Sequence, residues 1–229
     1  MQEALAWPAQ GLFTIPAYFD YAATVTWALS GAVVGVRRSY DIVGVFVVAL
    51  LSSMGGGLLR DGILLQRTPA FLTDGTYLIL IATVTVLVAV NNRWLKLVPR
   101  RPTVDTAVGW MDAVGIPAYA VVGMQLAAAQ GLPVPGVVLV GLVNGVGGGL
   151  LRDVVVDDPR RLLQPGQFEA LVVLLACLTF VLLTRSLALH PMPAGWITMV
   201  LFVIVRALVI RFNWKTSALR PIEDRETDR

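Results

Sequence analysis

Hydrophobic residues gather in seven long stretches that are separated by short polar connections. A helix needs about 20 apolar residues to cross a bilayer, and stretches of about this length lie at residues 18–36, 42–65, 76–95, 107–129, 134–157, 167–186 and 194–212. The pattern predicts an all-α integral membrane protein with seven transmembrane helices. The connections leave no room for a soluble domain, so residues 1–215 are predicted to form a single transmembrane domain.

Composition supports this interpretation. Of the 229 residues, 56% are hydrophobic and 14% are charged, and the mean hydropathy is +0.73. These charges are too few to cover the surface of a soluble domain of this size. Charged residues are concentrated at the end of the chain, where residues 216–229 are predicted to form a disordered tail.

One heptapeptide, Gly-Gly-Gly-Leu-Leu-Arg-Asp, occurs twice, 92 positions apart, and supplies the glycines Gly55, Gly56, Gly57, Gly147, Gly148 and Gly149. The same displacement pairs Asp20 with Asp112 and Gly31 with Gly123. The repeat is therefore predicted to be a unit of three helices. Repeat 1 covers about residues 18–95, repeat 2 covers about residues 107–186, and a seventh helix at about residues 194–212 has no counterpart.

Basic residues predict the orientation. Thirteen follow the first, third, fifth and seventh stretches, namely Arg37, Arg38, Arg93, Lys96, Arg100, Arg101, Arg160, Arg161, Arg211, Lys215, Arg220, Arg225 and Arg229. The even-numbered stretches are followed only by Arg67 and Arg185. Cytoplasmic loops carry the excess of Lys and Arg, so the N-terminus is predicted to lie outside and the C-terminus in the cytoplasm.

A three-helix unit crosses the membrane an odd number of times. Spans 1–3 and spans 4–6 are therefore predicted to form inverted repeats, related by a pseudo-two-fold axis in the membrane plane. This arrangement places both glycine triplets near the middle of the bilayer, facing each other.

The glycine triplets are candidates for a pore waist and hinge. Each glycine weakens a helix by roughly 1 kcal/mol relative to alanine. In membrane proteins glycine serves close helix packing or loosens backbone that lines a pathway, and spacing alone does not separate these uses. We predict that the triplets bend or unwind the second and fifth helices and turn carbonyl oxygens toward a cation pathway.

Four charged residues follow the triplets inside apolar stretches: Arg60, Asp61, Arg152 and Asp153. Charges at such positions are costly and normally face a partner or water. Neighbouring residues lie about 100° apart on a helix, which argues against pairing within each Arg-Asp dipeptide. We predict the pairs Asp20 with Arg60 and Asp112 with Arg152. Structural pairing and pore lining both remain open.

Enzyme motifs are missing from the sequence. It contains no Gly-x-x-x-x-Gly-Lys, no Gly-x-Ser-x-Gly and no His-Glu-x-x-His, which carry phosphate binding, nucleophilic catalysis and zinc hydrolysis. One histidine, His190, and one cysteine, Cys177, make no metal site. We predict that the protein is not an enzyme and needs neither a cofactor nor a metal.

With its doubled glycine motif, inverted repeats and basic cytoplasmic side, the chain resembles the trimeric intracellular cation (TRIC) channel family over about residues 12–212, most closely the prokaryotic branch. The resemblance implies a homotrimer in the prokaryotic plasma (inner) membrane. Each protomer would enclose its own pore, lined by the first, second, fourth and fifth helices. It implies passive conduction of monovalent cations, usually potassium, with membrane lipids and no nucleic acid as partners.

One feature of animal members is missing. They carry Lys-Glu-Val in the second helix and bind phosphoinositides there, whereas this chain has Leu-Leu-Ser-Ser-Met at residues 50–54, so that control is not carried over. An alternative function is secondary transport of a small solute such as glycine, which inverted repeats also serve. A third is a structural membrane protein whose glycines only pack helices.

Overall fold

The computed structural model describes residues 17–91, 102–157 and 169–212, and every element in them is a helix. The predicted all-α class is confirmed. In chain order the elements are α1 (Ala17–Arg37), α2 (Ile42–Leu58), η2 (Leu59–Leu64), α3 (Ala70–Thr73), α4 (Thr76–Val90), α6 (Pro102–Ala129), α7 (Val134–Val155), α9 (Glu169–Val181), η3 (Leu182–Ser186) and α10 (Pro191–Arg211).

The helices coincide with the apolar stretches of the sequence. Two of them, α2 and α9, continue directly into the π-helical segments η2 and η3. The connection between η2 and α4 contains the short helix α3. Most of the linker that joins the two repeats lies outside the described residues, and so does the charged tail at residues 216–229.

Within the described residues, three helices are long and apolar enough to cross a membrane: Ile42–Leu64, Val134–Val155 and Pro191–Val209. Three shorter apolar helices occupy Thr76–Val90, Ala113–Ala129 and Leu171–Ser186. Ile42–Leu64 is the longest of the three spanning helices. At a rise of 1.5 Å per residue it is about 35 Å long, which exceeds the roughly 30 Å hydrocarbon core.

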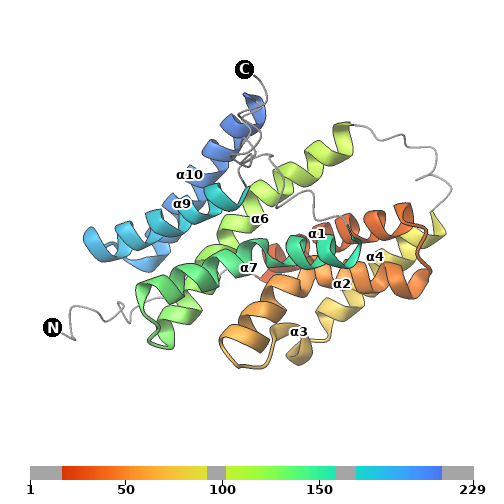
Figure 1. Ribbon diagram of the computed structural model, residues 1–229, viewed down its shortest axis with the longest axis horizontal. Coiled ribbons are helices and arrows are strands. Elements are labelled where there is room, and N and C mark those ends of the chain that lie inside the picture. Colours follow the sequence, from red (N-terminus) through yellow and green to blue (C-terminus); the bar gives the residue numbers. More distant parts are fainter. Residues whose placement is uncertain (1–16, 92–101, 158–168, 213–229) are drawn as a thin grey trace, which may run out of the picture.

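The helices form two groups that follow the two repeats. Figure 1 shows α1, α2 and α4, coloured red to yellow, in one part of the molecule and α6, α7, α9 and α10, coloured green to blue, in the other. Each group has its own hydrophobic core, one built from α1, α2 and α4 and the other mainly from α6, α7, α9 and α10. Helix α10 packs on α6 and α9, and therefore extends the second group.

Both groups use the same contact between their first two helices. A Cβ atom on Gly31 of α1 would lie 2.6 Å from the carbonyl oxygen of Val48 on α2. One on Gly123 of α6 would lie 3.1 Å from the carbonyl oxygen of Val140 on α7. These four residues are related by the 92-residue displacement. Close helix approach at a small residue is thus part of the repeated unit.

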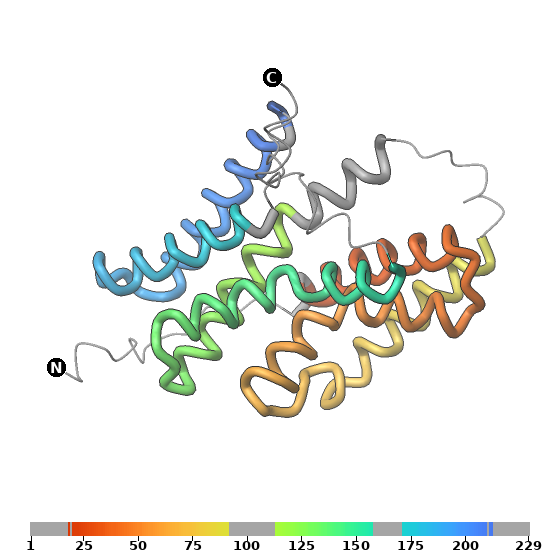
Figure 2. The backbone as a smooth tube through the Cα atoms, in the orientation of Figure 1, coloured from red at the N-terminus to blue at the C-terminus, as the bar shows by residue number. Residues whose placement is uncertain are grey.

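Helices α2 and α7 join the two groups by packing against each other. Figure 2 shows the tubes of α2 and α7 curving past one another near the centre of the molecule. At the crossing, a Cβ on Gly55 would lie 3.1 Å from the Cα of Gly148, and one on Gly147 would lie 3.2 Å from the Cα of Gly56. The two triplets face each other, as the repeat predicted.

Candidate functional site: a glycine crossing with buried charge pairs

The first two glycines of each triplet hold the α2 and α7 backbones together. A Cβ on Gly56 would lie 2.4 Å from the carbonyl oxygen of Asn144, and a Cβ on Gly148 would lie 2.5 Å from that of Ser52. Real Cβ atoms are not found so close to backbone oxygens, so no side chain fits at either position. Helix packing explains why glycine occupies them.

The third glycine of each triplet has different surroundings. A Cβ on Gly57 would find its nearest neighbour, Nη2 of Arg60, at 3.9 Å, and a Cβ on Gly149 would find Nη2 of Arg152 at 3.9 Å. Neither glycine is required by a close backbone contact. Both lie beside a guanidinium, where the missing side chain leaves room.

The predicted unwinding at the triplets is wrong. Helix α2 stays α-helical through Gly55–Gly57 to Leu58, and α7 is α-helical from Val134 to Val155. The departure in repeat 1 comes after the triplet, where Leu59–Leu64 form a π-helix. The cost of glycine in a helix is offset by the packing of α2 on α7, so the backbone hydrogen bonds are retained.

Arg60 is paired with its sequence neighbour. Its Nε donates to Oδ1 of Asp61 at 2.7 Å and its Nη2 donates to Oδ2 at 2.5 Å. Both side chains are buried, with 8% of Arg60 and 0% of Asp61 exposed. The bidentate pair shows that the prediction against pairing within the dipeptide was wrong, because the long arginine side chain reaches around the angle between neighbours.

Repeat 2 contains the equivalent pair. Nε of Arg152 donates to Oδ1 of Asp153 at 2.8 Å, and both side chains are buried. Each of the four charges that follow the triplets therefore has a partner of opposite sign, as its burial requires.

Each arginine also contacts the other repeat. Nη1 of Arg60 on η2 donates to Oδ1 of Asn144 on α7 at 3.2 Å. Nη1 of Arg152 on α7 donates to Oγ of Ser30 on α1 at 3.1 Å. The Gly-Gly-Gly-Leu-Leu-Arg-Asp motif thus combines helix crossing, charge compensation and a polar contact between repeats.

Asp20 has partners other than Arg60. Its carboxylate accepts hydrogen bonds from the hydroxyls of Tyr77 on α4 and Tyr119 on α6. The carbonyl of Tyr119 in turn accepts from Nδ2 of Asn144 at 2.6 Å. The predicted Asp20–Arg60 pair is therefore wrong, since tyrosine hydroxyls satisfy the carboxylate and Asp61 satisfies the guanidinium.

The second predicted pair, Asp112 with Arg152, involves a side chain outside the described part of the structure. Arg152 has Asp153 and Ser30 as partners, and pairing with Asp112 stays a prediction. At the other end of the site, Nε of Arg67 lies 3.2 Å from Oδ1 of Asp61.

Sequence reasoning missed Asn144, Ser30, Tyr77 and Tyr119 as members of this polar group. Asn144 carries a signal that could have identified it, because it is an amide inside an apolar stretch and its repeat counterpart is the polar Ser52. The tyrosines carry no such signal, since aromatic residues are common in membrane helices.

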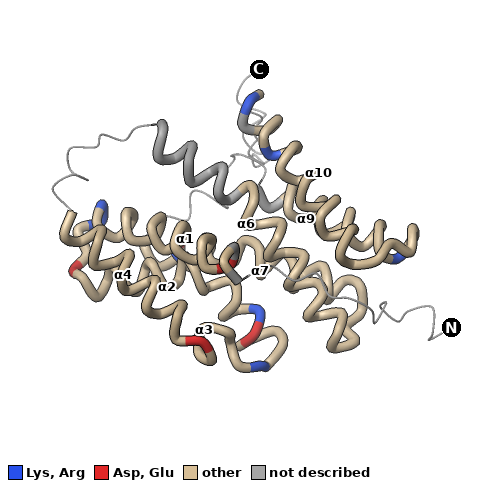
Figure 3. Tube along the Cα trace, turned by 180° about the vertical axis from the view of Figure 1, so that it is seen from behind, with Lys and Arg blue, Asp and Glu red and all other residues tan. Residues whose placement is uncertain are grey.

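Charged segments are sparse along the described chain. In Figure 3 most of the tube is tan, and the blue and red segments lie mainly near helix ends, with one cluster close to α3. The described residues contain no group of His, Cys, Asp and Glu that could hold a metal ion.

Comparison with known proteins identifies the family. A family model described as "Glycine transporter" matches residues 17–93 and residues 109–185. The chain belongs to this family. The second matched segment begins 92 residues after the first, which is the displacement between the two copies of the glycine motif.

Several curated members are UPF0126 membrane proteins, which belong to the TRIC family. The Deinococcus radiodurans protein is 33% identical over 62% of this chain and 63% of its own length. YvgT of Bacillus subtilis is 26% identical over 83% of this chain and 90% of its own. The inner membrane protein YadS of Escherichia coli is 26% identical, with 86% and 93% covered.

Solved TRIC structures share the fold. A crystal structure of a prokaryotic TRIC channel in 0.5 M KCl has a TM-score of 0.72 at 26% identity, with 86% of this chain and 96% of that chain covered. The TRIC orthologue from Rhodobacter sphaeroides has a TM-score of 0.72 at 22% identity, covering 86% and 98%. The resemblance to the prokaryotic TRIC branch is confirmed.

Proposed function

We propose that the protein is a monovalent cation channel, permeable to potassium, with one pore in each protomer of a homotrimer. The observation that carries this proposal is the shared fold with a prokaryotic TRIC channel over 86% of the chain. The doubled motif supports it, because its two copies meet at the α2–α7 crossing.

The proposed membrane arrangement has seven spans, inverted repeats and a cytoplasmic C-terminus. The distribution of the basic residues along the sequence supports it, because thirteen follow the odd-numbered stretches and only Arg67 and Arg185 follow the even-numbered ones.

In the proposed pathway, we infer that helices α2 and α7 bend at the glycine triplets and that cations pass beside the third glycines. Gly57 and Gly149 leave room next to the guanidiniums of Arg60 and Arg152. Asp61 and Asp153 neutralise these guanidiniums. A cation near the crossing therefore meets compensated charge, which lowers the barrier that a bare guanidinium would raise in a low-dielectric site. Conduction of this kind needs no cofactor.

Purified protein in a planar bilayer with a potassium gradient tests this function. A channel gives discrete single-channel current steps that reverse at the potassium equilibrium potential. Current without steps, or no current from folded protein, would contradict the proposal.

Secondary transport of glycine is the second candidate, because the matching family model carries that description. Inverted repeats, which are predicted for this chain, are common in alternating-access transporters. The two functions differ in kinetics: a transporter gives saturable, glycine-dependent flux into liposomes, whereas a channel passes potassium without glycine.

A further inference from the structure

Arg67 is placed over the charge pair of repeat 1 by the backbone that follows η2. The amide of Leu65 donates to the carbonyl of Arg60 at 2.8 Å, and the amide of Arg67 donates to the carbonyl of Asp61 at 2.8 Å. Between them, Gln66 has a φ of 49°, in the left-handed region that side chains rarely adopt. The chain therefore turns back toward Asp61 rather than leaving the helix in a straight line.

This turn gives Asp61 two cationic partners. Oδ1 of Asp61 accepts from Nε of Arg60 at 2.7 Å and lies 3.2 Å from Nε of Arg67. The side chain of Arg67 is 41% exposed, whereas that of Asp61 is 0% exposed. One carboxylate cannot neutralise two guanidiniums, so this group of three residues keeps a net positive charge whose accessible part is Arg67.

The pair in repeat 2 differs in the described residues. Arg152 is matched by Asp153 alone and otherwise donates to the neutral hydroxyl of Ser30. The sequence position equivalent to Arg67 is Pro159, which lies outside the described part. Arg67 is thus a feature of repeat 1 that the repeated motif itself does not require.

We propose that Arg67 is a charge filter at the end of the pathway where η2 ends, lowering the local concentration of cations and discriminating against divalent ones. This inference rests on the proposed channel function. The energy of repulsion between a fixed positive charge and a divalent cation is twice that for a monovalent cation at the same distance. The Boltzmann depletion of a divalent ion is therefore the square of that of a monovalent ion.

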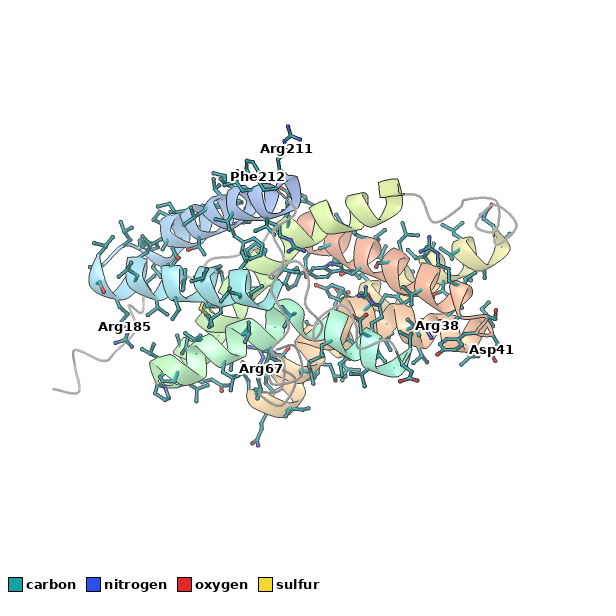
Figure 4. All side chains as sticks on the ribbon, turned by 45° about the horizontal axis from the view of Figure 1, so that its top comes forward. Arg38, Asp41, Arg67, Arg185, Arg211 and Phe212 are labelled. Atoms are coloured by element: carbon teal, nitrogen blue, oxygen red, sulfur yellow. The ribbon has the colours of Figure 1, made fainter. Side chains whose placement is uncertain are left out.

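Three variants in a planar bilayer test the filter. Arg67→Gln removes the charge and leaves the Arg60–Asp61 pair, and Arg67→Lys keeps the charge. Arg185→Gln is the matched control, because Arg185 is the other arginine that follows an even-numbered stretch, and Figure 4 shows it at the far left of the molecule, away from Arg67. Potassium current is measured in both directions at about 0.01 M and about 1 M salt, where the Debye lengths are about 30 Å and about 3 Å. Magnesium is added to each side in turn.

At low salt, Arg67→Gln is expected to raise potassium entry from one side about twofold, and to lower the magnesium concentration that halves the current on that side about fourfold. Both differences vanish at high salt, and Arg67→Lys and Arg185→Gln behave like the wild type. Unchanged currents in Arg67→Gln, changes that persist at high salt, or equal changes in Arg185→Gln would overturn the filter. Wild-type protein without current steps would refute the channel function itself, and the filter with it.

Discussion

Arg60 and Asp61 show how a buried charge is accommodated at the level of single residues. The carboxylate is fully buried and accepts two hydrogen bonds from the neighbouring guanidinium. Breaking such a pair leaves an uncompensated charge in a low-dielectric environment, whereas removing both partners leaves none. The stability of the pair therefore depends on both side chains being present.

A double-mutant cycle on Arg60 and Asp61 tests this pairing. Asp61→Leu is expected to cost about 3–5 kcal/mol, because it leaves the buried guanidinium of Arg60 without a counter-charge. Arg60→Leu costs less, since Arg67 remains beside Asp61. The loss of stability in the double variant should be smaller than the sum of the losses in the two single variants. Melting temperatures of the purified protein measure the coupling.

A second cycle, on Arg60 and Asp20, is the control. Asp20 accepts from two tyrosines and Arg60 donates to Asp61. The effects of Arg60→Leu and Asp20→Leu on stability should therefore couple more weakly than those of Arg60→Leu and Asp61→Leu, because Tyr119 and Asn144 lie between the two charged groups. Strong coupling between Arg60 and Asp20, with none between Arg60 and Asp61, would contradict the assignment.

At the level of elements, the crossing of α2 and α7 determines how the repeats meet. Gly56 and Gly148 bring each backbone against a carbonyl oxygen of the other helix, and the arginines add polar contacts across the same boundary. Each repeat therefore makes one contact of each kind to the other repeat. The two copies of one sequence motif together form the crossing.

Gly56→Ala is expected to lower stability by about 1–3 kcal/mol or more, since its methyl group would meet the carbonyl oxygen of Asn144 at 2.4 Å and force the backbones apart. Gly62→Ala is the matched control, because Gly62 is exposed and its nearest neighbour, Cδ1 of Leu58, would be 3.7 Å away. Thermal unfolding compares the two. Equal stability of both variants would show that α2 and α7 are not in backbone contact.

The polar contacts between repeats are unequal. Asn144→Ala removes the acceptor for Arg60 and the donor to the Tyr119 carbonyl, so it should cost about 1–3 kcal/mol. Ser30→Ala removes one hydroxyl, which Arg152 contacts at 3.1 Å, and should cost less. Chemical denaturation of the two variants gives the order. A larger loss for Ser30→Ala would contradict these contacts.

At the level of the whole molecule, the sequence predicted the helices and the repeat well because their causes are local or periodic. Apolar stretches define helices at nearly the observed limits, and the 92-residue displacement identifies the triplets that meet. The partners of Arg60 and Asp20 were mispredicted because they depend on side-chain reach and on tyrosines from distant helices. Helix geometry alone does not contain that information.

The proposed orientation can be measured by cysteine labelling, since the single native cysteine, Cys177, is fully buried. Ser39 and Thr68 are exposed in the connections that follow α1 and η2. A membrane-impermeant maleimide on intact cells should label Thr68→Cys and should label Ser39→Cys only after lysis, because the positive-inside rule places Arg37 and Arg38 in the cytoplasm. The reverse pattern would invert the topology.

If cations pass beside the third glycines at the α2–α7 crossing, methyl groups at these glycines should narrow the pathway. The test is the single-channel conductance of the double variant Gly57→Ala/Gly149→Ala, with Gly62→Ala as the control. Both methyl groups fit without a clash, because the nearest atom to each would be 3.9 Å away. We expect a lower potassium conductance in the double variant, with trimer yield and melting temperature preserved and Gly62→Ala unchanged. Wild-type conductance in a folded, trimeric Gly57→Ala/Gly149→Ala variant would contradict it.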